Sequence, residues 1–183
     1  MKNLKLITAV TFAFTIFMSF NAQAQEFKDL DKSPMDVAAF PADYKESDKL
    51  VKITYSRPQL KGRPVEQLAE KGKVWRAGAN EAAEITFYEA MKLGDTVIEP
   101  GTYTFYLIPD ENEWTAIISS DLNVWGSYFY DEKNDVARFT VPLLKTREAL
   151  EAFSIAFEKA DNGVTMHIGW GTLRVAFPFT IKS

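Results

Sequence analysis

Apolar and polar residues alternate over short stretches of this chain, and turn-forming residues separate the stretches. In residues 50–56, Val51, Ile53 and Tyr55 alternate with polar neighbours, which is the period of a strand with one buried face. The same pattern, with abundant aromatic residues, predicts further strands. These strands cover residues 84–89, 103–108, 114–119, 128–130 and 136–141.

The clearest hairpin is predicted in residues 153–170, where Asn162-Gly163 has the sequence of a type I′ turn. A two-residue turn fixes the register of the strands that it joins. The predicted cross-strand pairs are Asp161–Val164, Glu158–His167, Phe157–Ile168 and Ile155–Trp170. The apolar pairs share one face and are expected to be buried together, while Glu158 and His167 share the opposite face.

The rest of the domain contains less regular patterns. Pro64 favours a first helical turn, so residues 65–69 are predicted to form a short helix. Residues 142–150 are predicted to be a connection. A final strand over residues 173–181 is expected at a sheet edge, because Pro178 has no amide hydrogen to donate to a ladder.

These elements predict an all-β fold, an antiparallel β-sandwich with jelly-roll or Greek-key-like connections and one short helix. A sandwich is favoured because most strands keep one polar face. Residues 50–183 are expected to form a single domain. Residues 25–49 are polar and lack a sustained period, so they are predicted to be an N-terminal lead-in segment.

The first 24 residues have the three parts of a secretory signal peptide. A lysine-containing start precedes an apolar run from Leu6 to Phe20, and Ala22-Gln23-Ala24 supplies small residues for cleavage after Ala24. The run is shorter than the roughly 20 residues of a membrane-spanning helix. We therefore expect export to the periplasm or cell exterior, without stable membrane insertion after cleavage.

The net charge narrows the classes of expected partner, and the cysteine content bears on how the domain is stabilised. Removal of Lys2 and Lys5 with the signal peptide leaves 19 basic against 25 acidic residues, a net charge of −6. This acidic balance argues against a nucleic-acid partner. Cysteine is absent, so packing without disulfides must stabilise the domain.

The most distinctive polar cluster occupies residues 72–83, where Trp, Arg, Asn and Glu are flanked by glycines. Guanidinium groups bind planar oxyanions, and an indole ring stacks on a sugar. The candidate ligand-binding residues are Arg57, Arg63, Trp75, Arg76, Asn80 and Glu81. A structural interpretation is also open, in which the arginines pair with acids, Trp75 lies in the core and Asn80-Glu81 caps a turn.

Catalytic and metal chemistry have weak support in the sequence. His167 is the only histidine, Gly-x-Ser-x-Gly is absent, and the His and Cys ligands of a zinc site are missing. No catalytic residue, metal ligand or cofactor is therefore predicted. The acidic segment Asp131–Asp135 has oxygen ligands in an order that differs from an EF-hand loop, which favours a solvated hairpin tip.

Two other possibilities remain open from the sequence. Any two of the 25 acidic residues can form the carboxylate pair of a glycoside hydrolase, since the sequence defines no separation. Trp125, Tyr128 and Tyr130 lie near a predicted loop, where they form either a sugar-binding platform or part of the core.

The chain resembles a secreted bacterial family called domain of unknown function 2911. The resemblance rests on Tyr55-Ser56-Arg57-Pro58, Lys61-Gly62-Arg63, the run from Gly72 to Glu81, Pro100-Gly101-Thr102-Tyr103 and Met166-His167-Ile168-Gly169-Trp170. The resemblance covers about residues 50–179. It implies a β-rich fold and export, and it assigns no activity to any residue.

The resulting hypothesis is an exported, non-catalytic β-sandwich module. It is expected to bind a small polar or carbohydrate-like ligand, or a partner protein, through residues 57–63 and 75–81. The alternative is a hydrolase or lyase of envelope material that uses carboxylates and arginines from the same surface. Convergent acids in a concave pocket favour the enzyme.

Overall fold

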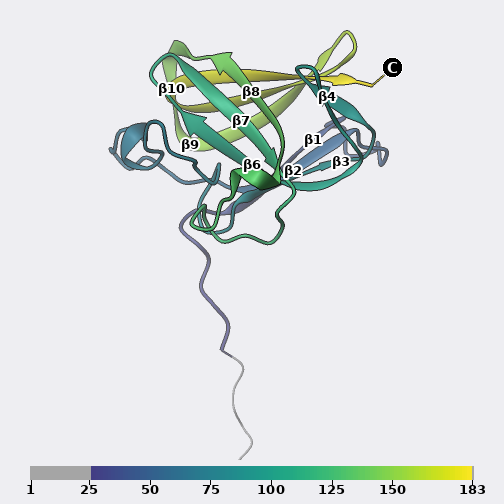
Figure 1. The fold of residues 1–183 in the computed structure, drawn as a ribbon. Coiled ribbons are helices and arrows are strands. Elements are labelled where there is room, and N and C mark those ends of the chain that lie inside the picture. Colours follow the sequence, from purple (N-terminus) through teal and green to yellow (C-terminus); the bar gives the residue numbers. More distant parts are fainter. Residues whose placement is uncertain (1–25, 183) are drawn as a thin grey trace, which may run out of the picture. The chain divides into compact units, whose positions relative to one another are not determined.

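The computed structural model describes residues 26–182, so the predicted signal peptide, residues 1–24, lies outside the described residues. The chain divides into two compact units between Leu30 and Asp31. All described strands and helices belong to the second unit (Figure 1). Within residues 26–182, no helix is long and apolar enough to cross a membrane.

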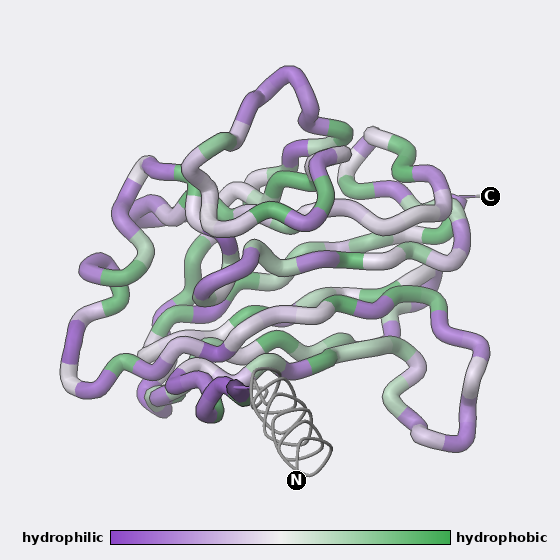
Figure 2. Tube along the Cα trace, turned by 90° about the horizontal axis from the view of Figure 1, so that it is seen from below, coloured by the Kyte–Doolittle hydropathy of each residue, from purple (hydrophilic) through white to green (hydrophobic). Residues whose placement is uncertain are grey.

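Two antiparallel sheets form the second unit, which confirms the predicted all-β sandwich. The six-stranded sheet has the order β1 (Met35–Phe40), β2 (Val51–Ser56), β3 (Ala83–Phe87), β6 (Gly101–Pro109), β7 (Glu113–Ser119) and β8 (Asp135–Pro142). The four-stranded sheet has the order β5 (Thr96–Ile98), β4 (Met91–Leu93), β10 (Gly163–Ile181) and β9 (Leu144–Ala160). Buried and more exposed positions alternate along most of β2 and all of β3, as the sequence predicts. Hydrophobic and hydrophilic stretches are intermixed along the tube in Figure 2.

Helical structure is limited to two short 3-10 segments. The first, η1 (Val65–Gln67), lies within the predicted helix of residues 65–69. The second, η2 (Glu132–Asn134), lies in the acidic segment that was expected to be a hairpin tip. The Asp131 side chain caps η2 by accepting a hydrogen bond from the backbone amide of Lys133.

Aromatic rings join the two sheets in the core. Trp75 stacks on Trp170 from β10, with ring centroids 5.3 Å apart and planes inclined by 12°. Phe153 from β9 meets Trp75 edge-on at 4.9 Å and also contacts Trp170 at 5.7 Å. Tyr55 from β2 adds a third edge-on contact with Phe153, at 5.7 Å. Offset-stacked and edge-to-face contacts of this kind are the preferred aromatic geometries.

The register predicted for the β9–β10 hairpin is wrong by two residues. The pairs are Ala160–Gly163, Phe157–Met166, Ala156–His167 and Ile155–Ile168, so the turn is Asp161-Asn162. Gly163 is the first residue of β10 and not part of the turn, and its close approach to Phe179 requires glycine, since a Cβ would lie 2.1 Å from the Phe179 carbonyl oxygen. A two-residue shift preserves the faces, because side chains alternate with a period of two.

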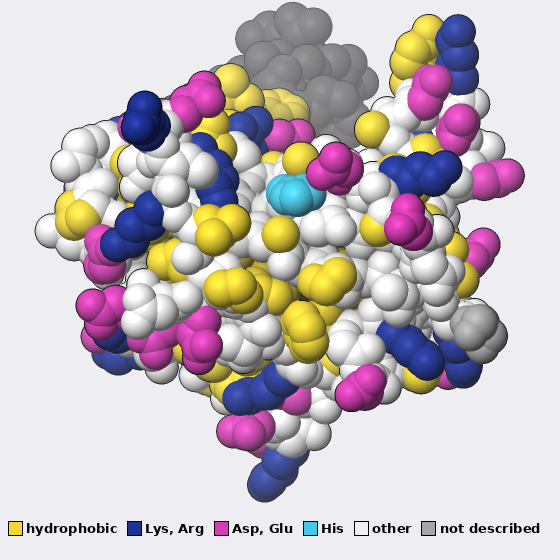
Figure 3. All heavy atoms as spheres, turned by 90° about the horizontal axis from the view of Figure 1, so that it is seen from above, with side chains coloured by type: hydrophobic (Ala, Val, Ile, Leu, Met, Phe, Trp, Pro, Cys, Tyr) yellow, Lys and Arg dark blue, Asp and Glu magenta, His cyan; other side chains and the backbone are white. Residues whose placement is uncertain are grey.

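The predicted contact between Glu158 and His167 is therefore present as a diagonal pair. His167 Nε2 lies 3.0 Å from Glu158 Oε2, and both side chains are exposed. Figure 3 shows the histidine beside an acidic side chain on one face of the molecule. Phe157 is only half-buried, whereas Ile155, Ile168 and Trp170 lie in the core.

Edge strands account for two other differences from the sequence predictions. Residues 25–49 were predicted as a lead-in, yet they contribute β1, which pairs with β2 alone. Residues 142–150 were predicted as a connection, yet most of them belong to β9. Residues at the start of β9 are exposed on both faces, so they lack the alternation of a half-buried strand.

The aromatic segment 128–130 is a turn rather than the predicted strand. Gly126 adopts a left-handed conformation with φ of 71°, which redirects the chain before this segment.

The final strand was expected at a sheet edge, yet β10 lies between β4 and β9. Pro178 immediately precedes the ladder with β4, which starts at Phe179, so the missing proline amide leaves that ladder intact.

The burial pattern predicts unequal effects of mutations in β9 and β10. Phe153→Ala should lower the free energy of unfolding by about 3–5 kcal/mol, because it removes a fully buried ring. Phe157→Ala should cost less, and His167→Gln should cost under about 1 kcal/mol, because the pair with Glu158 is solvent-exposed. Urea unfolding measures all three, and equal losses for the two phenylalanine variants would contradict the position of Phe157 at the core margin.

Candidate functional site

Arg57 connects strands through three hydrogen bonds. Its Nη1 lies 2.9 Å from the carboxylate of Asp36 in β1. Its Nε donates to the carbonyl oxygen of Phe153 at 3.1 Å, and its Nη2 donates to Ser154 Oγ at 2.8 Å, both in β9. These contacts favour the structural interpretation of Arg57, because its donors on all three nitrogens are engaged within the fold.

Arg63 and Arg76 have different surroundings. Arg63 donates to the carbonyl oxygens of Leu60 at 2.9 Å and Gln59 at 2.8 Å, and thereby closes its own loop. Arg76 is half-buried, and its Nε has no hydrogen-bond partner among the described residues. Within residues 26–182, none of the three candidate arginines forms an ion pair with Glu81. The arginine contacts share no residue, so they do not define a common pocket.

Trp75 lies in the core, as the structural interpretation predicts, and only 5% of its surface is exposed. Its backbone amide donates to the carbonyl oxygen of Leu107 at 2.7 Å, and the Leu107 amide donates back to Trp75 at 2.9 Å. The side chain and backbone of Trp75 therefore fix the first part of the 72–83 stretch against β6 and the aromatic core.

Unusual backbone conformations shape the residues that follow Trp75. Gly78 passes so close to β2 that a Cβ would lie 3.1 Å from the carbonyl oxygen of Ser56. Ala77 and Asn80 are left-handed, with φ of 50° and 62°. Such residues persist only where the surroundings hold them, and strained backbone is concentrated at functional sites. The Asn80 side chain also donates to the Asp31 carboxylate at 3.0 Å.

The 72–83 stretch is joined by hydrogen bonds to residues 120–130, which we call the aromatic loop. The Ala82 amide donates to Val124 at 2.9 Å, and the Gly126 amide donates to Asn80 at 3.0 Å. A β-bridge also pairs Glu81 with Trp125. The structure therefore brings the predicted candidates Asn80 and Glu81 together with one end of the proposed aromatic platform.

Two side-chain hydrogen bonds add to this attachment. Ser127 Oγ donates to the carbonyl oxygen of Val74 at 2.8 Å. The Asn123 amide donates to Glu84 Oε1 at 3.0 Å. The aromatic loop is therefore bound at several points along its length and is preorganised by the sheet.

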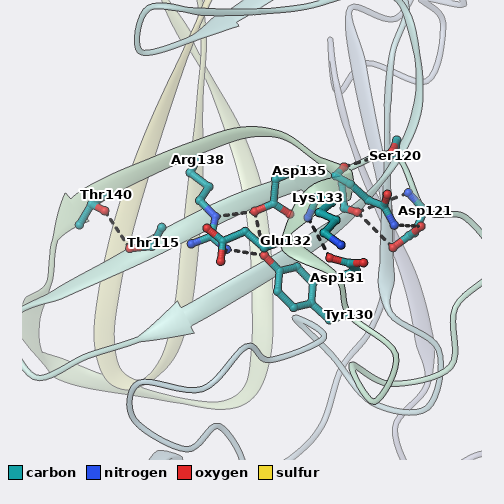
Figure 4. A network of polar contacts seen from close by, with 12 residues as sticks. Thr115, Ser120, Asp121, Tyr130, Asp131, Glu132, Lys133, Asp135, Arg138 and Thr140 are labelled. Atoms are coloured by element: carbon teal, nitrogen blue, oxygen red, sulfur yellow. Dashed lines mark hydrogen bonds and ion pairs between the residues drawn. The ribbon is translucent and has the colours of Figure 1, made fainter.

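A polar network closes the base of the aromatic loop (Figure 4). The Tyr130 hydroxyl donates to the Asp135 carboxylate at 2.8 Å, and Arg138 donates to both groups. On the other side, the Ser120 amide donates to the carbonyl oxygen of Asn134 at 2.9 Å. The Asn134 side chain also donates to the Asp121 carboxylate at 2.9 Å. Charge-assisted bonds of this type are stronger than neutral ones, so the two ends of the loop are held together.

Tyr106 lies beneath this network and has no exposed surface. Its ring meets that of Tyr130 edge-on at 5.3 Å. The Tyr106 hydroxyl and Asp135 Oδ1 are buried without hydrogen-bond partners among the described residues. Burial, reinforced by the carboxylates of Asp121 and Asp135, raises the pKa of Tyr106 to about 12. Burial and the bond to Asp135 likewise raise the pKa of Tyr130 to about 12.

The aromatic loop displays large apolar side chains to solvent. Trp125 is 52% exposed, Tyr128 is 79% exposed and Phe129 is 84% exposed. Tyr130, which the sequence grouped with the first two, instead packs on Tyr106. Clustered exposed aromatics of this kind mark interaction sites. The surface interpretation is therefore favoured for Trp125 and Tyr128, and the packing interpretation for Tyr130.

A hollow of about 240 Å³ lies beside the bridge between Glu81 and Trp125. Its polar lining includes Thr54, Glu81, Glu84 and Asn123, and no lysine or arginine lines it. Carboxylates and hydroxyl groups accept hydrogen bonds, and amide and hydroxyl groups also donate them. Within residues 26–182, no cluster of three or more His, Cys, Asp or Glu side chains could hold a metal ion.

Sequence reasoning did not select Glu84 or Asn123. Glu84 occupies a polar position within a regular strand and resembles any solvated strand residue. Asn123 adopts a left-handed conformation in the structure, with φ of 57°. In the sequence, its place near Trp125 in a predicted loop is what could have marked it as a site residue. Their proximity depends on the pairing of the aromatic loop with residues 80–84.

The fold and surface together define a β-sandwich that displays aromatic side chains from an anchored loop. The chain belongs to the family described as "Protein of unknown function (DUF2911)", whose model matches residues 33–179. The match includes β1, and it confirms the family that the sequence motifs suggest. No curated protein and no solved structure matches the chain significantly.

The raised pKa of Tyr106 predicts an alkaline loss of stability. Both states are protonated below the unfolded value near 10, so its stabilising contribution is complete there and is lost as pH rises through about 12. Tyr106→Phe should reduce this loss. At neutral pH the variant should be at least as stable as the natural protein, because it removes an unpartnered hydroxyl.

Urea unfolding between neutral pH and pH about 12 tests this prediction. Tyr128→Phe is the matched control, because Tyr128 is largely exposed and its replacement should leave the pH profile unchanged. A marked destabilisation by Tyr106→Phe at neutral pH would contradict the account, since it would reveal a hydrogen bond made by the hydroxyl.

Proposed function

We propose that this protein is an exported, non-catalytic module that binds a carbohydrate-like ligand at the aromatic loop and the adjacent hollow. The observation that carries the proposal is the β-bridge that holds the half-exposed Trp125 beside Glu81, at a hollow lined by polar acceptors. Export is part of the proposal and is supported by the signal-peptide pattern of residues 1–24.

The surface combines the two features that sugars require. An indole or phenol ring packs against the apolar face of a sugar ring, and Trp125 and Tyr128 offer such rings. The hydroxyl groups of a sugar bind carboxylate, amide and hydroxyl partners, which Glu81, Asn123 and Thr54 offer in the hollow. A neutral saccharide fits better than a uronic acid, because only negative charges line the hollow.

Preorganisation of the aromatic loop also supports binding. The Ala82 amide donates to Val124, and the Gly126 amide donates to Asn80. These two bonds fix the backbone on both sides of Trp125. A ligand therefore does not have to order this backbone when it binds, which reduces the entropic cost of association.

The alternative hypothesis, a hydrolase or lyase based on carboxylates and arginines, has less support. Glu81 and Glu84 both line the hollow, but one Glu84 oxygen already accepts the Asn123 amide and so holds the aromatic loop in place. Mechanisms of glycoside hydrolysis generally use two carboxyl groups. Arg57 and Arg63 are bound to other parts of the fold.

Calorimetric titration of residues 25–183 with neutral and uronic oligosaccharides tests the proposal. Trp125→Ala should weaken binding of the neutral series by about 1–2 kcal/mol, a loss of roughly 5- to 30-fold, because it removes the stacking surface. Tyr44→Ala is the control, because Tyr44 is an exposed aromatic outside the aromatic loop, with 89% exposure.

Binding of neutral oligosaccharides that is lost in Trp125→Ala and retained in Tyr44→Ala supports the proposal. Hydrolysis or elimination products in the same mixtures would favour the alternative enzyme. Absence of binding throughout the series, or equal effects of both substitutions, would overturn the assignment of this surface.

A further inference from the structure

A second cavity, of about 360 Å³, shares no lining residue with the hollow beside Trp125. It lies at the η1 end of the second unit. Its lining comes from residues 65–71, the turn between β6 and β7, and the starts of β9 and the second half of β10. Elements of both sheets therefore contribute to it, and the proposed carbohydrate site leaves it unexplained.

The cavity has an apolar floor. Trp114 and Ala69 are almost fully buried there, and Leu143 and Leu173 pack against the core from half-buried positions. Trp114, Leu143 and Leu173 also pack towards Trp170, where the side chains leave no room for a water molecule. This lining suits a hydrocarbon group that packs on the floor of the cavity, because burial of apolar surface is favourable.

The rim of the cavity is charged, and part of its charge is internally paired. Lys71 Nζ lies 3.3 Å from Asp110 Oδ1 and 2.9 Å from Glu111 Oε2. The hydrogen bond to Glu111 is the main reason that the pKa of Lys71 lies above its usual range. The bond to Lys71 lowers the pKa of Glu111 in turn. This triad therefore stays ionised over the physiological pH range.

Two further charged residues line the cavity. Glu66 and Lys145 form no ion pair within the part of the chain that the structure describes. Lys145 nevertheless acts electrostatically on Glu111, whose pKa it helps to lower. Across the whole rim, three carboxylates stand against two ammonium groups, which leaves one negative charge in excess. Among the described residues, Glu66 is the rim carboxylate that forms no ion pair.

We propose that this cavity binds a small amphipathic cation, an alkyl or arylalkyl ammonium compound. The hydrocarbon group packs on Trp114, Leu143 and Leu173, and the ammonium group lies at the rim near Glu66. The net charge of −4 for the whole chain acts in the same direction, because an acidic protein attracts cations. An amphipathic carboxylate instead meets three acidic groups, and Lys145 is the rim cation that no described ion pair occupies.

Three probes with six carbon atoms each separate charge from apolar burial: hexylamine, hexanol and hexanoate. Their affinities for residues 25–183 can be measured by chemical-shift titration of the amides around the cavity. We expect hexylamine to bind most tightly and hexanoate least tightly. Glu66→Gln should reduce the preference for hexylamine over hexanol by about two- to fivefold, as expected for an exposed charge pair.

Lys145→Gln is the matched control, because it removes a rim charge of the opposite sign. It should leave hexylamine binding unchanged or stronger. Trp125→Ala should not alter binding of the amine, which keeps this test separate from the carbohydrate proposal. Preference for hexanoate, equal affinity for amine and alcohol, or no shift of amides around the cavity would each overturn the inference.

Discussion

The stack of Trp75 on Trp170 is the contact on which the arrangement of the surface depends. It places a residue from an irregular segment in the centre of the core, where Phe153 meets both indole rings edge-on. The backbone of Trp75 is meanwhile paired with Leu107 in β6. Burial of the side chain and pairing of the backbone together fix where the chain goes next, towards Asn80 and Glu81.

The outer surface is built on this fixed segment. Asn80 and Ala82 make backbone hydrogen bonds to the aromatic loop, and the Tyr130–Asp135–Arg138 network closes the loop at its base. The arrangement includes a destabilising feature, because the hydroxyl of Tyr106 is buried without a partner. Largely exposed aromatic side chains above a tightly bonded base are more useful for recognition than for stability.

The sequence predicts much of the fold because most strands bury one face. Alternation identifies β2, β3, β6, β7 and β8, and it assigns the inward residues of β9 and β10 correctly even though the register is shifted. The shift could not be predicted locally, since Gly163 is required by its approach to Phe179 at the other end of β10. Edge strand β1 was missed because a strand with one neighbour need not bury a whole face.

The candidate site was less predictable, because it depends on contacts between distant segments. The sequence identified the 72–83 stretch, but it left open whether Trp75 or Trp125 faces solvent. The answer depends on Trp170 for the first residue and on the bridge to Glu81 for the second. The role of an arginine is equally ambiguous in the sequence. Arg57 binds acceptors on Phe153 and Ser154, which lie far from it along the chain.

The central claim is that the aromatic loop is held rigidly by the segment that Trp75 anchors. Hydrogen exchange of the Ala82 and Gly126 amides in the ligand-free protein tests it most directly, because these amides form the bonds between the two segments. The account predicts that both exchange as slowly as amides in the interior of β6, through openings close to global unfolding. Exchange at the rate of an unstructured peptide would contradict the claim.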